Sequence, residues 1–229
     1  MSRPPPAMLF AAGRGTRMAP LTDSLPKPLI RVAGRPLLDH ALDLLRDAGL
    51  TRIVANTHYL AERIQPDLKA RGVAWSHEPD LLETGGGMRK AVPLLGPGPV
   101  VTLNTDCVWN GPNPVTQLLA AWRPATMDAL LILVPPHHAL GHTGAGDFTR
   151  DGDGRLTRAP GLVYAGVQMI KTDRLYEIAD AAFSLNRLWD MMAADGRLFG
   201  VPYTGRWCDV GRPESIALAE AMLGWNSNV

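Results

Sequence analysis

The chain has 229 residues, 46% of them hydrophobic and 20% charged, and a formal net charge of +1. This balance is that of an ordinary globular protein, and the lack of a long Lys/Arg run argues against a nucleic-acid-binding surface. No stretch approaches the roughly 18 apolar residues of a membrane span, so we expect a cytoplasmic protein without membrane contact. Residues 1–6, Met-Ser-Arg-Pro-Pro-Pro, are expected to be a disordered tail.

The first predicted element is a short buried strand that ends in a glycine loop. Residues 7–12 form an apolar run, and two glycines follow within three positions. Small residues let a ligand approach the backbone closely, and successive N–H groups in such a turn form an anion-binding concavity. Two basic side chains add positive charge at the same mouth. The loop therefore predicts a polyphosphate site made of Ala11, Ala12, Gly13, Gly15 and Thr16, with Arg17 and Lys27.

Two better-known glycine loops do not fit this stretch. A P-loop ends in Gly-Lys-Ser/Thr, which is absent here. The dinucleotide fingerprint needs a third glycine for close helix packing, and that position is Met18. A nicotinamide-dependent dehydrogenase is therefore disfavoured. A Gly-x-Gly alone is weak evidence, and an ordinary tight turn is the alternative.

Strands and helices alternate through the first half of the chain. Helical spacing predicts helices over 37–48, 60–71, 86–95 and 113–122, while apolar runs predict strands over 52–56, 73–76, 99–104 and 129–134. Strands that are apolar throughout indicate a mostly parallel sheet with helices on both faces, an α/β, Rossmann-like fold. In such sheets ligands bind beyond the carboxyl ends of the strands.

The second half of the chain differs in character. Residues 151–154, Asp-Gly-Asp-Gly, are a hairpin turn signal. The pattern further predicts strands over 162–170 and 197–203 and helices over 185–194 and 215–223. We interpret residues from about 136 to 210 as a smaller, mixed lobe over the ligand mouth. The whole chain, 1–229, is then one domain, whose core comprises residues from about 7 to 135 and the C-terminal part.

Three consecutive glycines, in the stretch Leu82-Glu83-Thr84-Gly85-Gly86-Gly87, form the second informative motif. Such a run costs much chain entropy, so it is unlikely to be filler. Placed before a helix, the backbones of Gly85 and Gly86 could reach the edge of a flat ring or a phosphate. A flexible loop is the alternative.

Two aspartates provide candidate metal ligands. Asp106 follows a buried strand that ends at Asn104, and Asp209 precedes the last helix. Each could simply cap a helix. Together they offer two oxygens to one hard cation, and Mg²⁺ usually takes one or two carboxylates plus water and substrate phosphate. The adjoining Cys107 and Cys208 do not form a zinc pattern, and the histidines at 137, 138 and 142 lack metal-ligand spacing.

Asp147, in Gly146-Asp147-Phe148, could cap a turn or bind a sugar hydroxyl, and the sequence by itself favours the turn.

Taken in order, these motifs resemble the sugar-1-phosphate nucleotidyltransferases. The matching stretches are Ala11-Ala12-Gly13-x-Gly15-Thr16-Arg17, Pro20-Leu21-Thr22, Pro26-Lys27-Pro28-Leu29, Asn104-x-Asp106, Gly166 and Asp209-Val210-Gly211. They extend the resemblance over nearly the whole chain. One departure is Arg212, where the family usually has threonine. Residues 82–87, 146–148 and 207–211 are most similar to the branch of the family that couples UTP to N-acetylmuramate 1-phosphate in cell-wall sugar recycling.

The resemblance implies a nucleotide-binding core and a sugar-binding lobe. It implies Mg²⁺, or Mn²⁺ in its place, on Asp106 and Asp209, and phosphate contacts from Arg17 and Lys27. Nucleotide contacts are implied for the glycine loop, Asn104 and the backbones of Ala11, Gly85 and Gly86, and sugar contacts for Gly146, Asp147, Gly166 and Trp207. Arg206 or Arg212 could pair with the lactyl carboxylate of muramate. A monomer is weakly favoured.

Other functions stay open at this point. A mannose- or heptose-1-phosphate guanylyltransferase would share the same core, because small glycines leave no side chain to block a purine. A nucleotide-sensing domain without catalysis is a further alternative, although such a domain would be expected to have lost Lys27 or one of the two aspartates, and all are present.

Overall fold

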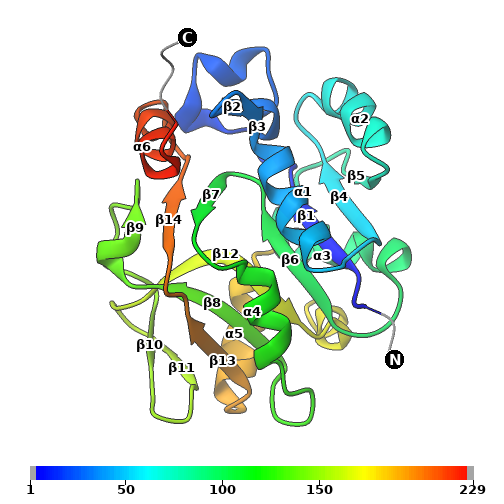
Figure 1. The fold of residues 1–229 in the computed structure, drawn as a ribbon. Coiled ribbons are helices and arrows are strands. Elements are labelled where there is room, and N and C mark those ends of the chain that lie inside the picture. Colours follow the sequence, from blue (N-terminus) through cyan, green and yellow to red (C-terminus); the bar gives the residue numbers. More distant parts are fainter. Residues whose placement is uncertain (1–3, 226–229) are drawn as a thin grey trace.

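The fold is built on a seven-stranded sheet, shown in the computed structural model of residues 4–225 (Figure 1). In spatial order the strands are β13 (Leu198–Pro202), β8 (Ala129–Val134), β12 (Val163–Ile170), β6 (Val100–Asn104), β1 (Ala7–Phe10), β4 (Ile53–Thr57) and β5 (Ala74–His77). Every neighbouring pair is parallel except the two that β12 makes, with β6 and with β8. The predicted α/β fold with a mostly parallel sheet is confirmed.

Helices cover both faces of this sheet, as predicted. One face packs against α1 (Leu37–Asp47), α2 (Ala61–Ala70) and α4 (Pro114–Ala121), and the other against α3 (Glu83–Leu95) and α5 (Leu185–Ala194). Successive strand side chains point to opposite faces, so in β1 Leu9 joins the first cluster and Met8 the second. The last helix, α6 (Glu214–Leu223), packs in a third cluster with Met18 and Val210.

Three small sheets stand outside the central one. They are the pair β2 (Arg31–Val32) and β3 (Arg35–Pro36), the hairpin β10 (Phe148–Arg150) and β11 (Leu156–Arg158), and the set β7 (Cys107–Asn110), β14 (Arg206–Asp209) and β9 (Ala139–Leu140). The predicted turn at residues 151–154 joins the hairpin. The strands β7 and β14 are not predicted from the sequence, and their antiparallel pairing sets Asp209 opposite Cys107.

The segment assigned to the smaller lobe contributes to the central sheet. Seven of the eight residues of β12 are buried, which suits a strand covered on both faces. Its register shifts between Tyr164 and Gln168, where Gly166 has a φ of +81°. Of the range 136–210, only β9, β10, β11 and β14 pair outside the central sheet.

Several element boundaries differ from the prediction. The helix α3 begins at Glu83 rather than at Gly86, so the three glycines lie inside its first turns and not in a loop before it. Pro66 lies within α2, which runs through it as one helix. The carbonyl of Pro6 accepts the N–H of Val101 at 3.0 Å, so the predicted disordered tail is wrong at this position, and residues 1–3 lie outside the described range.

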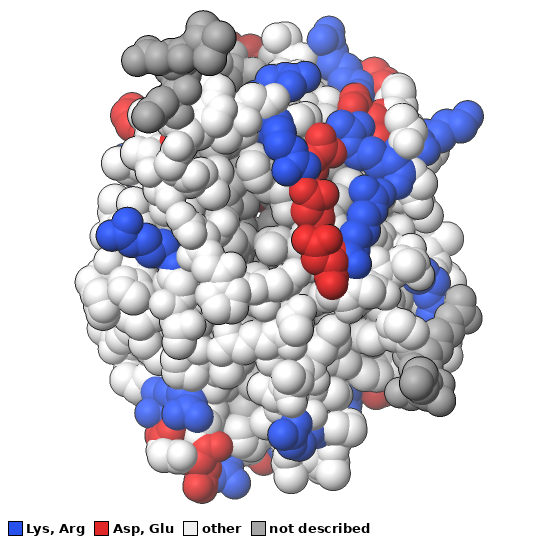
Figure 2. Space-filling model, viewed as in Figure 1, with Lys and Arg blue, Asp and Glu red and all other residues white. Residues whose placement is uncertain are grey.

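Charged side chains on the face shown in Figure 2 gather over α1 and α2, with both signs intermixed. Arg71 pairs there with Asp39 and Asp67, and Arg35 pairs with Asp43. The exposed pair of Arg35 and Asp43 contributes little stability, whereas Arg71 and Asp39 are partly buried. No helix among residues 4–225 has the length and apolar character needed to cross a membrane.

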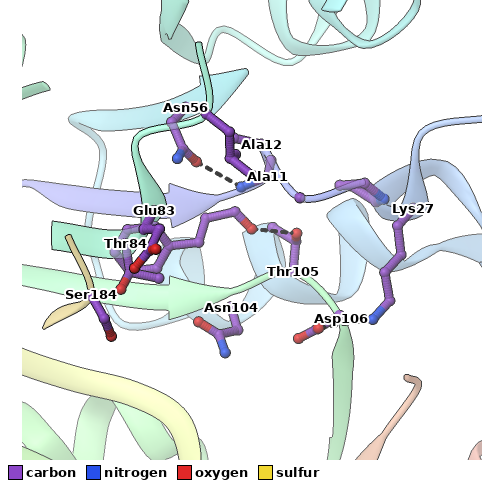
Figure 3. A pocket seen from close by; sticks show the side chains of 14 residues that line it. Ala11, Ala12, Lys27, Asn56, Glu83, Thr84, Asn104, Thr105, Asp106 and Ser184 are labelled. Carbon is purple, nitrogen blue, oxygen red and sulfur yellow. Dashed lines mark hydrogen bonds and ion pairs between the residues drawn. The ribbon is translucent and has the colours of Figure 1, made fainter. Parts of the chain in front are cut away.

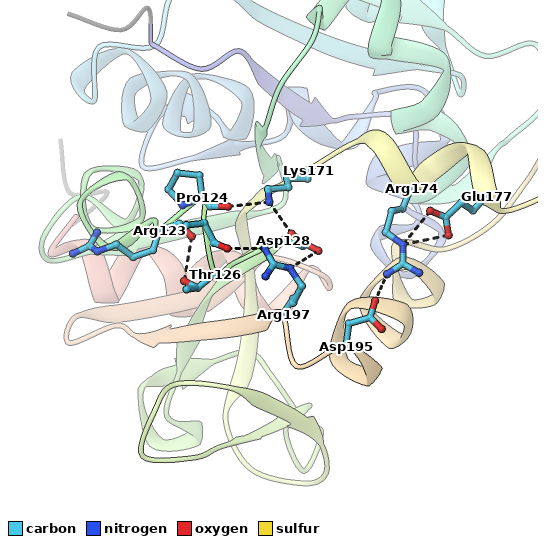
Figure 4. A network of polar contacts seen from close by, with 10 residues as sticks. Arg123, Pro124, Thr126, Asp128, Lys171, Arg174, Glu177, Asp195 and Arg197 are labelled. Atoms are coloured by element: carbon cyan, nitrogen blue, oxygen red, sulfur yellow. Dashed lines mark hydrogen bonds and ion pairs between the residues drawn. The ribbon is translucent and has the colours of Figure 1, made fainter.

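A more enclosed ionic cluster joins three strands of the second half (Figure 4). Asp128, just before β8, accepts from Lys171, just after β12, at 2.8 Å and from Arg197, just before β13, at 2.9 Å. The side chain of Asp128 is only 14% exposed. The cluster therefore connects the ends of β8, β12 and β13 at the end of the sheet that lies away from the glycine loop.

Candidate active site

A buried polar chain holds the loop that follows β1. The N–H of Ala11 donates to Oδ1 of Asn56 at 2.8 Å, and Nδ2 of Asn56 donates to Oε1 of Glu78 at 2.8 Å. The other carboxylate oxygen of Glu78 accepts the N–H of Leu82 at 3.1 Å. These bonds fix the glycine loop relative to the start of α3. Asn56 and Glu78 were not identified from the sequence, although each lies at or just past the carboxyl end of a strand, the signal that identified Asp106.

The two glycines of the loop have different structural roles. Gly15 has a φ of +62°, and a Cβ there would lie 3.0 Å from Cγ2 of Thr22 and 3.2 Å from Cβ of Lys27. A Cβ at Gly13 would meet no atom within 4 Å, because Gly13 faces an open cavity. Gly15 therefore permits the backbone conformation that leads into Thr16 and the following 3₁₀ turn, whereas Gly13 leaves room for a ligand.

A cavity of about 410 Å³ opens beside this loop (Figure 3). It is lined by Phe10, Ala11, Ala12, Gly13, Lys27, Pro28, Asn56, Leu81, Glu83, Thr84, Asn104, Thr105, Asp106 and Ser184. Figure 3 shows Lys27 and Asp106 at one end and Glu83 and Thr84 at the other. The structure thus brings six of the residues predicted for the nucleotide and metal sites into one cavity, from three different segments of the chain.

Two further predicted groups, Arg17 and Asp209, lie beside the charged end of the cavity, although neither of them lines it. Nζ of Lys27 donates to Oδ2 of Asp106 at 2.9 Å. The N–H of Val210 donates to the carbonyl of Asp106 at 2.8 Å, which sets the end of β14 beside it. A Cβ built on Gly211 would lie 2.9 and 3.0 Å from the carboxylate oxygens of Asp209 and 3.1 Å from Nη2 of Arg17. Arg17 and Asp209 are therefore neighbours.

The electrostatics of this end favour a cation. Burial raises the pKa of Asp209, the negative charge of Asp106 raises it further, and the charges of Lys27, Arg17 and His142 oppose the shift only in part. A raised pKa means that the ionised carboxylate is not fully stabilised by its surroundings. A bound cation would stabilise it. His142, which lacks metal-ligand spacing in the sequence, is close enough to Asp209 to contribute to this balance.

The donor set fits a divalent cation. Residues 4–225 contain no cluster of three or more His, Cys, Asp and Glu side chains placed to hold a metal ion. Two carboxylates are nevertheless a sufficient protein contribution for an ion that also binds water and phosphate oxygens. The neighbouring thiols do not suit a metal, because burial raises the pKa of Cys208 to about 12 and the pKa of Cys107 higher still, and metals bind the thiolate.

The three glycines of α3 serve close packing. The N–H groups of Gly85 and Gly86 both donate to the carbonyl of Phe183, at 2.8 and 3.1 Å. A Cβ at Gly85 would lie 2.3 Å from the ring of Phe183, and one at Gly86 would lie 2.4 Å from the carbonyl of Ala181. Neither glycine lines the cavity. Glu83, with an unusual φ of +59°, and Thr84 line it instead.

A second cavity, of about 290 Å³, adjoins the first and shares Phe10, Thr84, Asn104 and Ser184 with it. Its other lining residues are Asp147, Phe148, Arg158, Tyr164, Gln168, Leu185, Asn186 and Trp189. Oδ2 of Asp147 accepts the N–H of Tyr164 at 2.8 Å, so this carboxylate both supports the backbone and faces the cavity.

The other residues predicted for the sugar site do not line either cavity. Gly146 has a φ of +87°, and a Cβ there would lie 2.1 Å from the carbonyl of Gly161, so it permits a tight turn. A Cβ at Gly166 would lie 2.8 Å from Cβ of Asn104. The glycine therefore permits close packing against Asn104, which lines both cavities. Trp207 is 6% exposed and packs in the core beside Trp109.

Comparison with known proteins places the chain in a family. Residues 7–146 match the family model described as "MobA-like NTP transferase domain". The chain is 42% identical to an N-acetylmuramate alpha-1-phosphate uridylyltransferase of Caulobacter vibrioides, over 95% of this chain and 96% of that one. It is 35% identical to the protein of the same name from Neisseria meningitidis, over 95% of this chain and 98% of that one.

The fold also matches a solved structure, that of HddC from Yersinia pseudotuberculosis complexed with GMP-PN. The TM-score is 0.74 at 19% identity, over 95% of this chain and 98% of that chain.

Proposed function

Because this chain belongs to the family of MobA-like NTP transferase domains, we propose that it transfers UMP from UTP to N-acetylmuramate 1-phosphate and releases pyrophosphate. The substrates are those in the names of the relatives in Caulobacter vibrioides and Neisseria meningitidis, which match over nearly their whole length. The resemblance to sugar-1-phosphate nucleotidyltransferases found in the sequence agrees with these matches.

One structural observation carries the proposal. Two cavities meet at a common wall that includes Asn104, two residues before Asp106. The nucleotide occupies the first cavity, with its phosphates at the end that holds Lys27. The sugar occupies the second, with its phosphate directed toward Asp106. The two phosphates then meet where Lys27, Arg17 and the two aspartates converge.

The reaction needs positioning and charge neutralisation rather than a covalent enzyme intermediate. A phosphate oxygen of the sugar 1-phosphate attacks the α-phosphorus of UTP in line, a new P–O bond forms, and the bond to pyrophosphate breaks. A general base is unnecessary, because a sugar phosphate is already anionic near neutral pH. Lys27 and Arg17 neutralise charge on the phosphates, and Lys27 must exchange part of its contact with Asp106 to do so.

Asp106 and Asp209 are proposed to hold the divalent cation, Mg²⁺ or Mn²⁺. When bound, such an ion neutralises phosphate charge and keeps the two phosphates in contact. The glycine loop, Ala11 to Thr16, is proposed to face the nucleotide. For Gly85 and Gly86 to contact the base through their N–H groups, as the resemblance implies, the carbonyl of Phe183 would have to release them.

The proposed substrates also suggest where and in what form the protein acts. UTP is a cytoplasmic metabolite, so we place the reaction in the cytoplasm, as a step in the recycling of cell-wall sugars. We also propose that a monomer is active.

A pyrophosphate-release assay tests the proposal. It crosses ATP, CTP, GTP and UTP with a panel of sugar 1-phosphates, with Mg²⁺, with Mn²⁺ and with a chelator. We expect the highest kcat/KM for UTP with N-acetylmuramate 1-phosphate, and no turnover with the chelator. A preference for GTP with a neutral hexose phosphate would replace the proposal by a guanylyltransferase. Nucleotide binding without pyrophosphate release from any pair would indicate a nucleotide sensor.

A further inference from the structure

The second cavity contains a buried hydrogen-bond donor without a partner. Nε1 of Trp189 donates to Oε1 of Gln168 at 2.8 Å. An indole N–H can only donate, so this bond fixes which end of the amide is which. Nε2 of Gln168 is then a donor, and it has no partner among residues 4–225, although the side chain is fully buried in the cavity wall. An unpaired buried donor is costly, so this wall of the cavity carries an unmet hydrogen bond.

Arg158 is the basic residue among the groups that line this cavity, and Asp147 is the acidic one. The guanidinium lies 5.3 Å from the ring centroid of Phe148 and 5.8 Å from that of Trp189. Its Nε pairs with Asp190, and its Nη2 donates to the carbonyl of Asn186 at 3.1 Å. These contacts hold the side chain in one orientation. They leave both hydrogens of Nη1 and one hydrogen of Nη2 available, so the guanidinium can donate two parallel hydrogen bonds to a carboxylate.

The position of Arg158 matches one group of the proposed sugar. Arg158 lines the second cavity only, whereas the wall shared with the first cavity includes Asn104, close to Asp106. A sugar whose C1 phosphate points toward Asp106 directs its C3 substituent across the ring, away from that wall. In N-acetylmuramate this substituent is a lactyl ether that ends in a carboxylate. The negative charge of Asp147 further favours the Arg158 end for that carboxylate.

We propose that Arg158 is the specificity-determining residue that binds the carboxylate of the sugar 1-phosphate substrate, which it recognises by a charge-assisted, two-pronged hydrogen bond. The inference rests on the proposed function, because it requires an acidic sugar. It differs from the expectation drawn from the sequence, since neither Arg206 nor Arg212 lines either cavity. Arg158 does not take part in the chemical step. Its role is to favour acidic over neutral sugar phosphates.

The test compares two substrates that differ in the lactyl group, N-acetylmuramate 1-phosphate and N-acetylglucosamine 1-phosphate, each with UTP. Four proteins are compared: the wild type, Arg158→Gln, Arg158→Lys and the control Arg155→Gln. Arg155 lies on the same hairpin, stacks on Phe199 with its guanidinium 5.5 Å from the ring centroid and pairs with Asp153, but lies outside the cavity. Thermal melting verifies that each variant folds, and calorimetry measures the Kd of the two UDP-sugars.

We expect Arg158→Gln to lower kcat/KM for the muramate substrate by about 10- to 100-fold, the effect of losing a hydrogen bond to a charged group. The loss should lie in the KM for the sugar, while the KM for UTP and the rate with N-acetylglucosamine 1-phosphate stay the same. Arg158→Lys should lose less, and Arg155→Gln should change neither substrate. The Kd of the UDP-sugar that carries the carboxylate should rise by the same factor.

Equal losses with both substrates, or no loss with either, would overturn the inference while leaving the transferase activity intact. If the wild type releases pyrophosphate with neither substrate, the proposed function itself fails, and the inference fails with it. If Arg158→Gln does not fold, Arg158→Lys still decides the question, because it keeps the charge but not the fork. An unchanged substrate ratio in Arg158→Lys would then contradict the inference.

Discussion

Lys27 is the residue on which the charge balance of the proposed phosphate site depends. It is held by Asp106 and is only 11% exposed, whereas Arg17 is exposed beside Asp209. Removing one oriented charge of this kind costs about 100- to 1,000-fold in turnover. We expect Lys27→Ala and Arg17→Ala each to lower kcat by about 100-fold or more in the pyrophosphate assay. Thermal melting should show both folded, and Lys69→Ala, on the exposed side of α2, serves as the control. Near-normal rates in both would contradict the assignment.

Ionised Asp209 is expected to lower the stability of the folded protein in the absence of a bound cation. A carboxyl whose folded-state pKa is raised is destabilising while ionised, and the cost vanishes below the ordinary aspartate pKa, where both states are protonated. We expect Asp209→Asn to abolish turnover yet to raise Tm at pH 7 in the presence of a chelator. A shift of roughly 2–4 °C corresponds to about 1 kcal/mol in a chain of this size. The gain should shrink as the pH falls toward about 4. A lower Tm at pH 7 would refute this account.

At the scale of elements, the glycine loop and α3 use the same residue type for different purposes. A methyl group at Gly85 would overlap the ring and carbonyl of Phe183, whereas one at Gly13 would extend into open space. We therefore expect Gly85→Ala to lower the free energy of unfolding by about 2 kcal/mol or more, the range of overpacked cores. Gly13→Ala should keep the wild-type free energy of unfolding. Urea denaturation measures this quantity for both variants. Gly13→Ala should instead weaken nucleotide binding. Equal stability of the two variants would show that α3 can move away from Phe183.

Sequence patterns identified most of the long elements and missed the contacts that assemble the site. The runs at 129–134 and 185–194 were predicted with correct ends, because the first is an uninterrupted apolar run and the second has apolar residues at helical spacing. The strands β7 and β14 were missed, because each has only four residues and its partner lies about a hundred positions away in the chain. Asp106 and Asp209 were identified by their chemistry, but only this pairing brings them together. The reason for three glycines lies in Phe183 and Ala181, which no local pattern reveals.

At the scale of the whole molecule, the cluster around Asp128 holds the later strands in the sheet. Burial alone would raise the pKa of Asp128, but the hydrogen bonds from Lys171 and Arg197 outweigh it and lower the pKa. A depressed folded-state pKa gives stability that is present above the ordinary carboxyl pKa and is lost as the pH falls through the folded value. We expect Asp128→Asn to lower Tm by roughly 2–4 °C or more at pH 7. The difference from wild type should shrink below about pH 4.

The control for this cluster is Asp195→Asn. Asp195 pairs with Arg174 on the same side of the molecule (Figure 4), but its side chain is 52% exposed. An exposed pair contributes at most about 1 kcal/mol, so its Tm should change little at either pH. A larger loss for Asp195→Asn than for Asp128→Asn would contradict the view that enclosure makes the difference.

In the proposed function, the common wall of the two cavities makes each substrate a part of the other's binding site. Phe10, Thr84, Asn104 and Ser184 face both, so ordering them for one ligand removes part of the entropy that the second ligand would otherwise lose. Binding of a nucleotide analogue and of a sugar phosphate should then be synergistic, and by reciprocity each must increase the affinity for the other by the same factor. A cell that accumulates the sugar phosphate would thereby lower the concentration of nucleotide at which the enzyme is half-saturated, without any separate regulatory site.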